Sequence, residues 1–202
     1  IVLLQETTPA WEAAIREELS DRYPTMEFRH CCGAGGLAIL STYPIRDDDY
    51  LEAPPGGWFP GWRVTLETPG GPVQTLNVHL RPPFARSGGV AVGYFTTPAK
   101  RRRQIEAFHA ALDPALPTLI AGDFNESSGP AVGFLVEQDM VSALPEFRPK
   151  DDTWAWMTSV GRIEKRLDHV MYEHKRWKPL DARVLPGGRS DHQPVVVTLM
   201  HK

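Results

Sequence analysis

Short apolar segments alternate with turn residues along this chain, and that alternation restricts the folds it can adopt. The sequence holds 17 Gly and 19 Pro in 202 residues, well above average usage, and both residue types favour turns. The apolar segments 62–67 and 73–80, for example, flank Pro69-Gly70-Gly71-Pro72, which is typical of a hairpin turn. Frequent turns predict many short strands, so the pattern argues against an all-helical bundle.

Three segments carry helical periodicity. Residues 9–22 place apolar side chains on one face of a helix, residues 98–112 begin with Pro at a helix start, and residues 130–138 follow two serines that can cap a helix. About eight strands complete the chain, with no internal repeat and no linker. We therefore expect one domain over residues 1–202, built as an α/β sandwich of two sheets covered by helices.

Composition and charge exclude several classes of protein. Hydrophobic residues make up 42% and charged residues 23%, which is ordinary globular usage and argues against disorder. The net charge of −3 gives no global positive field to attract nucleic acid. Because no apolar run approaches the ~20 residues that span a bilayer, we expect no integral membrane association. No obligate protein partner is evident.

The cysteines say little about the compartment. Cys31 and Cys32 are the only two, and a bridge between adjacent cysteines is strained, so we expect no disulfide. The compartment stays open, with the cytoplasm slightly favoured. The chain starts inside an apolar run without an initiator Met, which indicates missing N-terminal sequence and leaves a signal peptide open.

Polar side chains stand at the ends of several predicted strands. In three strands the polar group comes last along the chain, and in two it comes first or just before the strand. If the first three strands run up and the other two run down, all these groups meet at one edge of the fold. The residues are Glu6, His79, Asp123 and Asn125 at strand ends, and Asp168, Asp191 and His192 at strand starts.

Such a cluster suits metal-assisted chemistry on phosphate esters. Mg²⁺ prefers oxygen ligands and needs only one or two carboxylates besides water and substrate phosphate, whereas zinc would need more His or Cys. A carboxylate at Asp168 would hold His192 in one tautomer and make it a better base. The Asn125 amide could donate to oxygens that gain negative charge. The cluster predicts hydrolysis of a phosphoester with Mg²⁺ or Mn²⁺.

The ordered set of motifs resembles a known family. LQET around Glu6, GLAILS, NVHL around His79, GDFN, RLDHVMY around Asp168 and the closing SDHQPV resemble the endonuclease/exonuclease/phosphatase (DNase I-like) family over nearly the whole chain. The resemblance implies a four-layer α/β/β/α sandwich of two mixed β-sheets flanked by helices. Family members also have a strand before the LQE strand that supplies an Asn near the metal, and we expect this chain to lack it.

The resemblance also implies roles for individual residues. Glu6 would bind the divalent metal, and Asp191 would lie at that metal or in its water shell. Asp168 would orient His192, which would act as a base or stabilise the phosphate. The remaining roles are activation of water by Asp123, orientation of that water by Asn125, and contact with the phosphate or leaving group by His79. The sequence does not assign the proton acceptor between Asp123 and His192.

Two further residues are candidates for substrate binding. Arg81 lies two residues after His79, so on a continuing strand it would share that face and could hold a phosphate bidentately; a surface Arg before a turn is an equal alternative. Trp154 could stack on a base or line a lipid groove, although such aromatics are more often core. The mild acidity argues against strong duplex DNA binding, and the short intervening loops favour a small phosphodiester or a single-stranded end. The rival hypothesis is a non-catalytic scaffold that binds phosphates or a protein.

Overall fold

The structure is a computed structural model that describes residues 1–83, 93, 95–159 and 161–202. Its largest sheet, which we call the central sheet, has six strands. In spatial order these are β4 (Ile45–Leu51), β5 (Gly61–Thr68), β6 (Gly71–His79), β7 (Thr118–Asp123), β11 (Asp168–Glu173) and β8 (Met140–Ser142). β6 and β7 are parallel, and the other neighbouring strands are antiparallel, so the central sheet is mixed as predicted.

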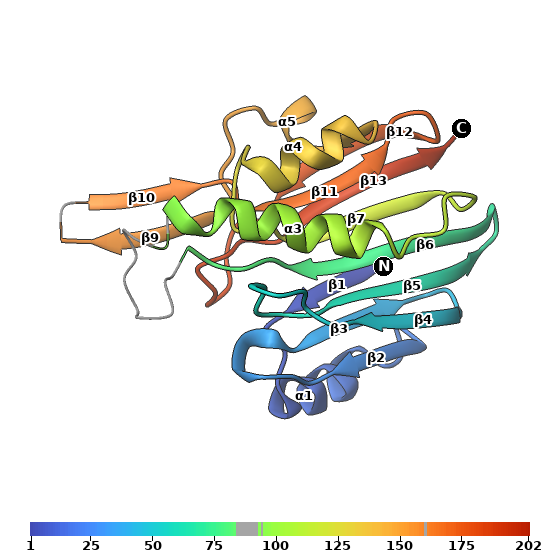
Figure 1. The fold of residues 1–202 in the computed structure, drawn as a ribbon. Coiled ribbons are helices and arrows are strands. Elements are labelled where there is room, and N and C mark those ends of the chain that lie inside the picture. The colour runs from blue at the N-terminus through green and yellow to red at the C-terminus, as the bar shows by residue number, and fades with distance from the viewer. Residues whose placement is uncertain (84–92, 94, 160) are drawn as a thin grey trace.

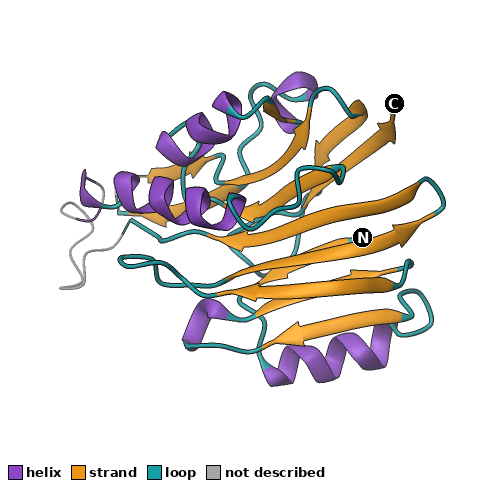
Figure 2. Cartoon of the chain, turned by 45° about the vertical axis from the view of Figure 1, so that its right-hand side comes forward, coloured by secondary structure: helices purple, strands orange, loops and turns teal. Residues whose placement is uncertain are grey.

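The second layer consists of two separate smaller sheets (Figure 2). One has three strands, in the order β1 (Val2–Gln5), β3 (Leu37–Ser41) and β2 (Thr25–Arg29), and the other pairs β12 (Trp177–Val184) with β13 (Val195–His201). All these pairs are antiparallel. A single cavity is lined by both β1 and β13, so the two small sheets leave a gap between them.

Helices cover the outer faces of the three-stranded sheet and of the central sheet (Figure 1). α1 (Pro9–Leu19) packs on the three-stranded sheet, while α3 (Pro98–His109) and α4 (Pro130–Glu137) pack on the central sheet; α5 (Leu144–Phe147) is a single short turn. α1 begins where Thr8 Oγ1 accepts the backbone N–H of Trp11, with Pro9 at the first helical position. No helix in the described ranges is long and apolar enough to cross a membrane.

Apolar side chains packed between neighbouring layers hold the four layers together. Every residue of β3 is buried, because its side chains alternate between two apolar partners. Ala38 and Leu40 pack with Ile15 of α1, while Leu37 and Ile39 pack toward the central sheet. A separate cluster joins α3 and α4 to the other face of the central sheet through Ile105, Phe108, Phe124 and Leu135. The predicted α/β/β/α sandwich is therefore confirmed.

Several elements were not expected from the sequence. β4 reads as a charged loop because Asp47, Asp48 and Asp49 interrupt its apolar pattern, yet it forms an edge of the central sheet, where charged side chains are common. β9 (Trp154–Thr158) and β10 (Gly161–Lys165) form a hairpin that projects beyond the sandwich (Figure 1). The residues of β9 and β10 are partly or fully exposed, so these strands lack the alternation of buried and exposed residues that identifies a strand in the sequence.

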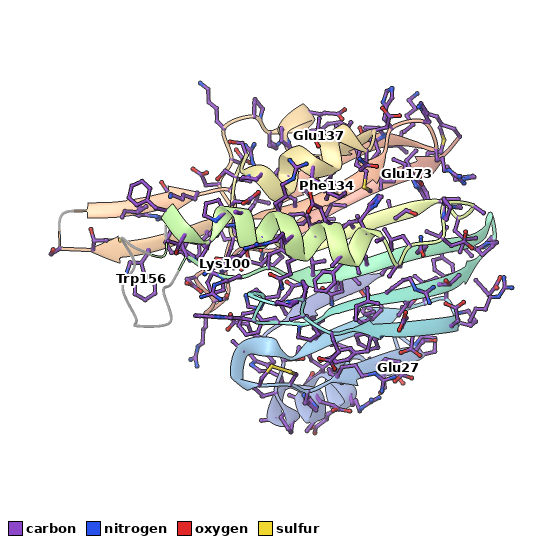
Figure 3. The ribbon with its side chains drawn as sticks, in the orientation of Figure 1. Glu27, Lys100, Phe134, Glu137, Trp156 and Glu173 are labelled. Carbon is purple, nitrogen blue, oxygen red and sulfur yellow. A yellow bond between two sulfur atoms is a disulfide. The ribbon has the colours of Figure 1, made fainter. Side chains whose placement is uncertain are left out.

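The two cysteines contradict the expectation that they stay unpaired. Cys31 and Cys32 form a disulfide, drawn as the yellow bond in Figure 3. Cys32 adopts a left-handed backbone conformation with φ 31° and ψ 67°, and Gly33 follows with φ 66°. These two left-handed residues turn the chain tightly at the pair, which is the local conformation that the sequence argument did not consider.

Candidate active site

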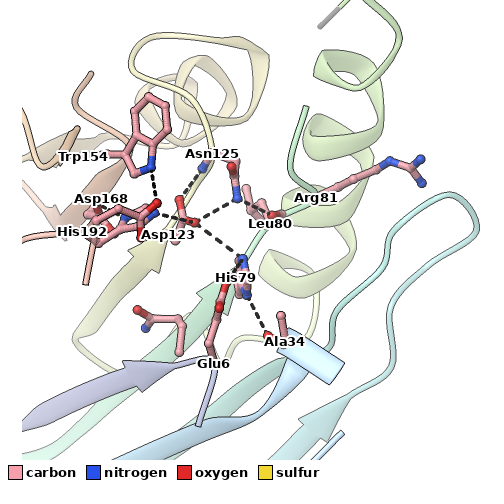
Figure 4. Close-up of polar contacts among 12 residues, drawn as sticks. Glu6, Ala34, His79, Leu80, Arg81, Asp123, Asn125, Trp154, Asp168 and His192 are labelled. Carbon is pink, nitrogen blue, oxygen red and sulfur yellow. Dashed lines mark hydrogen bonds and ion pairs between the residues drawn. The ribbon is translucent and has the colours of Figure 1, made fainter. Parts of the chain in front are cut away.

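Three neighbouring strands of the central sheet bring three polar side chains to one edge. β6 ends at His79 and the parallel strand β7 ends at Asp123, and these two residues are register partners. β11 runs antiparallel to β7 and begins at Asp168, which pairs in register with the same Asp123. Figure 4 shows the resulting cluster. The prediction that strand ends and strand starts meet at one edge is confirmed for these residues.

His192 contacts this cluster through Asp168. Its Nδ1 lies 2.9 Å from Asp168 Oδ2 and 3.1 Å from Oδ1. An ionised carboxylate can only accept, so Nδ1 carries the hydrogen, and Nε2 faces Asp123 Oδ2 at 3.9 Å. Burial opposes charge on the ring, but the hydrogen bond and charge of Asp168 outweigh it, with help from Asp123 and Asp191, and raise the pKa of His192 to about 9.

Asp123 is buried and is held by Asn125. The backbone N–H of Asn125 donates to Asp123 Oδ1 over 2.7 Å, and its side-chain amide donates to Oδ2 over 2.9 Å and to the Leu80 carbonyl over 3.0 Å. Asn125 reaches all three oxygens because its φ is 53°, a left-handed conformation that Asn tolerates better than most residues. Burial, followed by the nearby charge of Asp168, raises the pKa of Asp123.

His79 is buried and neutral at the floor of the cluster. Its Nδ1 lies 3.2 Å from the carbonyl of Ala34 and therefore carries the hydrogen, and its ring stacks on Phe59 with 4.3 Å between centroids. Nε2 faces Asp123 Oδ2 at 3.5 Å and Glu6 Oε1 at 3.8 Å. Burial lowers the pKa of His79 to about 4. The ring thus presents an unprotonated nitrogen to the two carboxyl groups.

Glu6 is brought to the cluster by a polar link between the two sheet layers. Gln5 Nε2 donates to Asn77 Oδ1 over 2.7 Å, and the buried Asn77 amide donates to the carbonyls of Leu4 and Ala38, each over 3.1 Å. Because Asn77 lies two residues before His79 on β6, this link fixes Glu6 beside His79. Glu6 has φ 58°, and its side chain is 62% exposed toward the cleft. Partial burial raises its pKa.

Trp154 and Asp191 form the wall next to His192. The indole Nε1 of Trp154 donates to Asp191 Oδ2 over 2.8 Å, and Trp154 and His192 are paired by an isolated antiparallel bridge. Both residues line the same cleft as Glu6 and Asp123. The structure therefore brings the predicted metal and substrate residues on this side together, with Trp154 anchored through its ring nitrogen.

The donor set fits a hard divalent cation. Asp123, Asp168 and His192 each offer a ligand atom, and these atoms lie within 4.8 Å of one another. This group differs from the predicted metal pair Glu6 and Asp191, which line the same cleft. Oxygen atoms dominate both sets, which suits Mg²⁺ or Mn²⁺ better than zinc.

Arg81 does not join the cluster. β6 ends at His79, so the alternation of faces that was expected to carry Arg81 toward the site does not extend to it. Its side chain points away from the cluster in Figure 4, is 1% exposed, donates to the Gly56 carbonyl over 2.8 Å and lies 4.3 Å from the Trp58 ring. Through these contacts Arg81 stabilises the loop that contains Gly56 and Trp58.

Two supporting residues escaped the sequence reasoning. Asn77 has a detectable signal, because a polar residue inside the apolar segment 73–80 needs a buried partner. Thr153 has none, although its hydroxyl donates to Asp168 Oδ2 over 2.5 Å. The cluster borders a cavity of about 2510 Å³, which extends into the gap between β1 and β13.

At one edge of an α/β/β/α sandwich, the structure gathers the buried Asp123 and His79 with further carboxylates along one cleft. The Endonuclease/Exonuclease/phosphatase family matches residues 1–192, and the chain belongs to this family. Members of the family are typically metal-dependent phosphoesterases and nucleases. No curated protein matches the chain.

Solved structures share the fold at low sequence identity. An endonuclease/exonuclease/phosphatase from Beutenbergia cavernae is 21% identical with a TM-score of 0.73; the match covers 99% of this chain but 61% of that protein. D. rerio TDP2, complexed with single strand DNA product, is 13% identical over 98% and 85% of the two chains, with a TM-score of 0.75. Sphingomyelinase C from Streptomyces griseocarneus is 19% identical over 97% and 85%, with a TM-score of 0.66.

Proposed function

We propose that this chain is a divalent-metal-dependent phosphodiesterase that hydrolyses its substrate by in-line attack of an activated water. One observation carries the proposal: His79, Asp123 and Asp168 are register partners on three adjacent strands, with His192 bonded to Asp168. Strand pairing of this kind fixes the positions of the groups before substrate arrives, and fixed polar groups are the largest source of transition-state stabilisation.

In this proposal some of the site residues contact the attacking water and others contact the phosphate. Asp123 Oδ2 and His192 Nε2 face each other at 3.9 Å, so these two groups are placed to contact the attacking water. Asp168 fixes the His192 ring so that Nε2 faces the cleft. Because the pKa of His192 is raised to about 9, the ring is protonated near neutral pH and would stabilise the phosphate, and it can accept a proton only above that pH. His79 and Asn125 border the same space and would contact the phosphate oxygens or the leaving group.

A divalent cation held by Glu6 and Asp191, or by the neighbouring Asp123 and Asp168, would supply charge neutralisation at the phosphate and a water of lowered pKa. The chain's own part is to hold these carboxylates in place. Asn125 donates two hydrogen bonds to Asp123, and Trp154 donates one to Asp191. Such donors orient ligating carboxylates.

The substrate class we propose is a small phosphodiester or a single-stranded nucleic-acid end. The net charge of −3 gives little attraction for duplex DNA. The cleft wall beside Asp191 carries Trp154 and Trp156, and an aromatic ring can stack on a base or pack on an apolar substituent. Similar folds occur in a protein solved with single strand DNA product and in a sphingomyelinase.

The test is hydrolysis of a substrate panel with Mg²⁺, Mn²⁺ or EDTA. The panel holds a generic phosphodiester, single- and double-stranded DNA, RNA, an inositol phosphate and sphingomyelin. We expect metal-dependent turnover by the wild type and its loss in His192→Ala. The matched control is His174→Ala, an exposed histidine beyond the far end of β11. Absence of turnover for every substrate, together with metal-independent phosphate binding, would favour the non-catalytic scaffold instead.

A further inference from the structure

Thr153 lies directly under the Asp168 carboxylate. It is 0% exposed, and its hydroxyl makes three hydrogen bonds: it lies 2.5 Å from Asp168 Oδ2 and 3.0 Å from each of the backbone nitrogens of Leu167 and Asp168. The two N–H groups can only donate, so they occupy the lone pairs of the hydroxyl oxygen. The single hydroxyl hydrogen therefore points to Asp168.

The backbone of Thr153 joins the segments that carry the Asp168 and His192 pair. Its N–H donates to the carbonyl of Lys165 over 3.1 Å, just before β11, and its carbonyl accepts from the N–H of Gln193 over 2.7 Å. Gln193 is the residue next to His192. One buried residue thus connects the base of the β9–β10 hairpin, the start of β11 and the segment that carries His192.

We propose that Thr153 is a positioning residue for the Asp168 and His192 pair, with its hydroxyl fixing the rotation of the Asp168 carboxylate. Asp168 Oδ2 is shared between the Thr153 hydroxyl and His192 Nδ1, at 2.5 Å and 2.9 Å. Two donors converging on one oxygen set the plane of the carboxylate, and that plane sets the orientation of the imidazole. The inference rests on the phosphodiesterase function proposed above.

Removing the hydroxyl has a defined structural consequence. In Thr153→Val the shape is kept, but the N–H groups of Leu167 and Asp168 lose their acceptor, and the Asp168 carboxylate loses its donor. The carboxylate can then turn away from His192. A substrate held by the metal and the phosphate contacts would still bind, so the loss should fall on kcat and leave KM nearly unchanged.

The kinetic experiment compares matched pairs of variants with the metal and substrate that give the highest wild-type turnover. Thr153→Val should lower kcat by about 10- to 100-fold with KM unchanged, and Thr153→Ser, which keeps the hydroxyl, should restore most of it. If Thr153→Val unfolds the protein, Thr153→Ala is compared with Thr153→Ser instead, because these two variants differ only in the hydroxyl. Thr158→Val, at the far end of β9, is the control.

A double-mutant cycle separates positioning from a general packing effect. If Thr153 acts through Asp168, Thr153→Val should change kcat less than about twofold in an Asp168→Ala background, because coupled residues are not additive. Equal losses in both backgrounds, or equal losses for Val and Ser, would overturn the proposal.

A second readout needs no activity. In the full chain the His192 Nδ1–H proton, assigned by its absence in His192→Ala, should give a downfield NMR resonance that is lost or shifted in Thr153→Val and kept in Thr153→Ser. If the wild type hydrolyses nothing on the panel, the phosphodiesterase proposal fails, and this resonance still decides the role of Thr153. An unchanged resonance in Thr153→Val would overturn that role.

Discussion

His169 on β11 makes the stability of this fold depend on pH. The side chain is 2% exposed, and its two ring nitrogens have partners: Nε2 lies 3.0 Å from the carbonyl of Glu126, and Nδ1 lies 3.0 Å from Ser142 Oγ. A carbonyl only accepts, so Nε2 carries the hydrogen, and Nδ1 accepts from the serine hydroxyl. The neutral ring is fully satisfied. Burial lowers the pKa of His169 to about 4.

The sign of the effect follows from the lowered pKa. An unfolded chain takes up a proton on this histidine as the pH falls below about 6.5, whereas the folded chain does so only near pH 4. The unfolded state binds more protons across that window, so the folded state loses stability as the pH falls. The loss amounts to about 1.4 kcal/mol at pH 5.5 and about 2.5 kcal/mol at pH 4.5, relative to pH 8.

The assay is urea unfolding of the wild type and His169→Gln at pH 8, 5.5 and 4.5. Other titrating groups, including His79, remain in both proteins, so the difference between the two unfolding free energies isolates His169. We expect His169→Gln to be the less stable protein at pH 8 and to regain about 2.5 kcal/mol relative to the wild type by pH 4.5. Parallel losses of stability in the two proteins would refute the reasoning.

Four further outcomes follow from the geometry. His192→Ala should lower kcat by at least about 100-fold without lowering the melting temperature, as steady-state kinetics and a thermal melt will show. Glu6→Gln should raise the Mg²⁺ concentration for half-maximal rate by about tenfold or more and leave urea unfolding unchanged, since the side chain is 62% exposed. Gly122→Ala should cost at least about 2 kcal/mol by urea unfolding, because Gly122 has φ 141° and an added Cβ would lie 2.0 Å from the Val78 carbonyl oxygen. Arg101→Leu should cost about 3–5 kcal/mol, because it leaves the Glu126 carboxylate buried without its partner at 2.7 Å; a loss under 1 kcal/mol would contradict this account.

Much of the site was predictable because its residues are marked locally. His79 and Asp123 each follow an apolar segment, and Asp168 precedes one, so each position could be predicted without knowing the tertiary fold. Whether the strands meet depends on their direction, which the sequence left as a condition: three strands running up and two running down. The strand register then placed Asp123 opposite both His79 and Asp168.

The rest depended on contacts between segments far apart in the chain. Arg81 was misplaced because the end of β6 is set by Leu80 and Arg81 turning to other partners, Asp123 and Gln104, rather than by any local signal. Thr153 escaped notice because its partners lie 14 and 15 residues away across an exposed hairpin. The Cys31 and Cys32 bridge depended on a backbone conformation that composition does not reveal.

The division of the second layer also affects how the molecule behaves in solution. β1 pairs only with β3, and β13 pairs only with β12, so in the described ranges each keeps one row of backbone N–H and C=O groups without a strand partner. The floor between them is apolar, with Leu119 and Ala121 of β7 lining the cavity. An unpaired strand edge can hydrogen-bond with another extended segment, so these two edges and the apolar surface between them form a place where such a segment could pair.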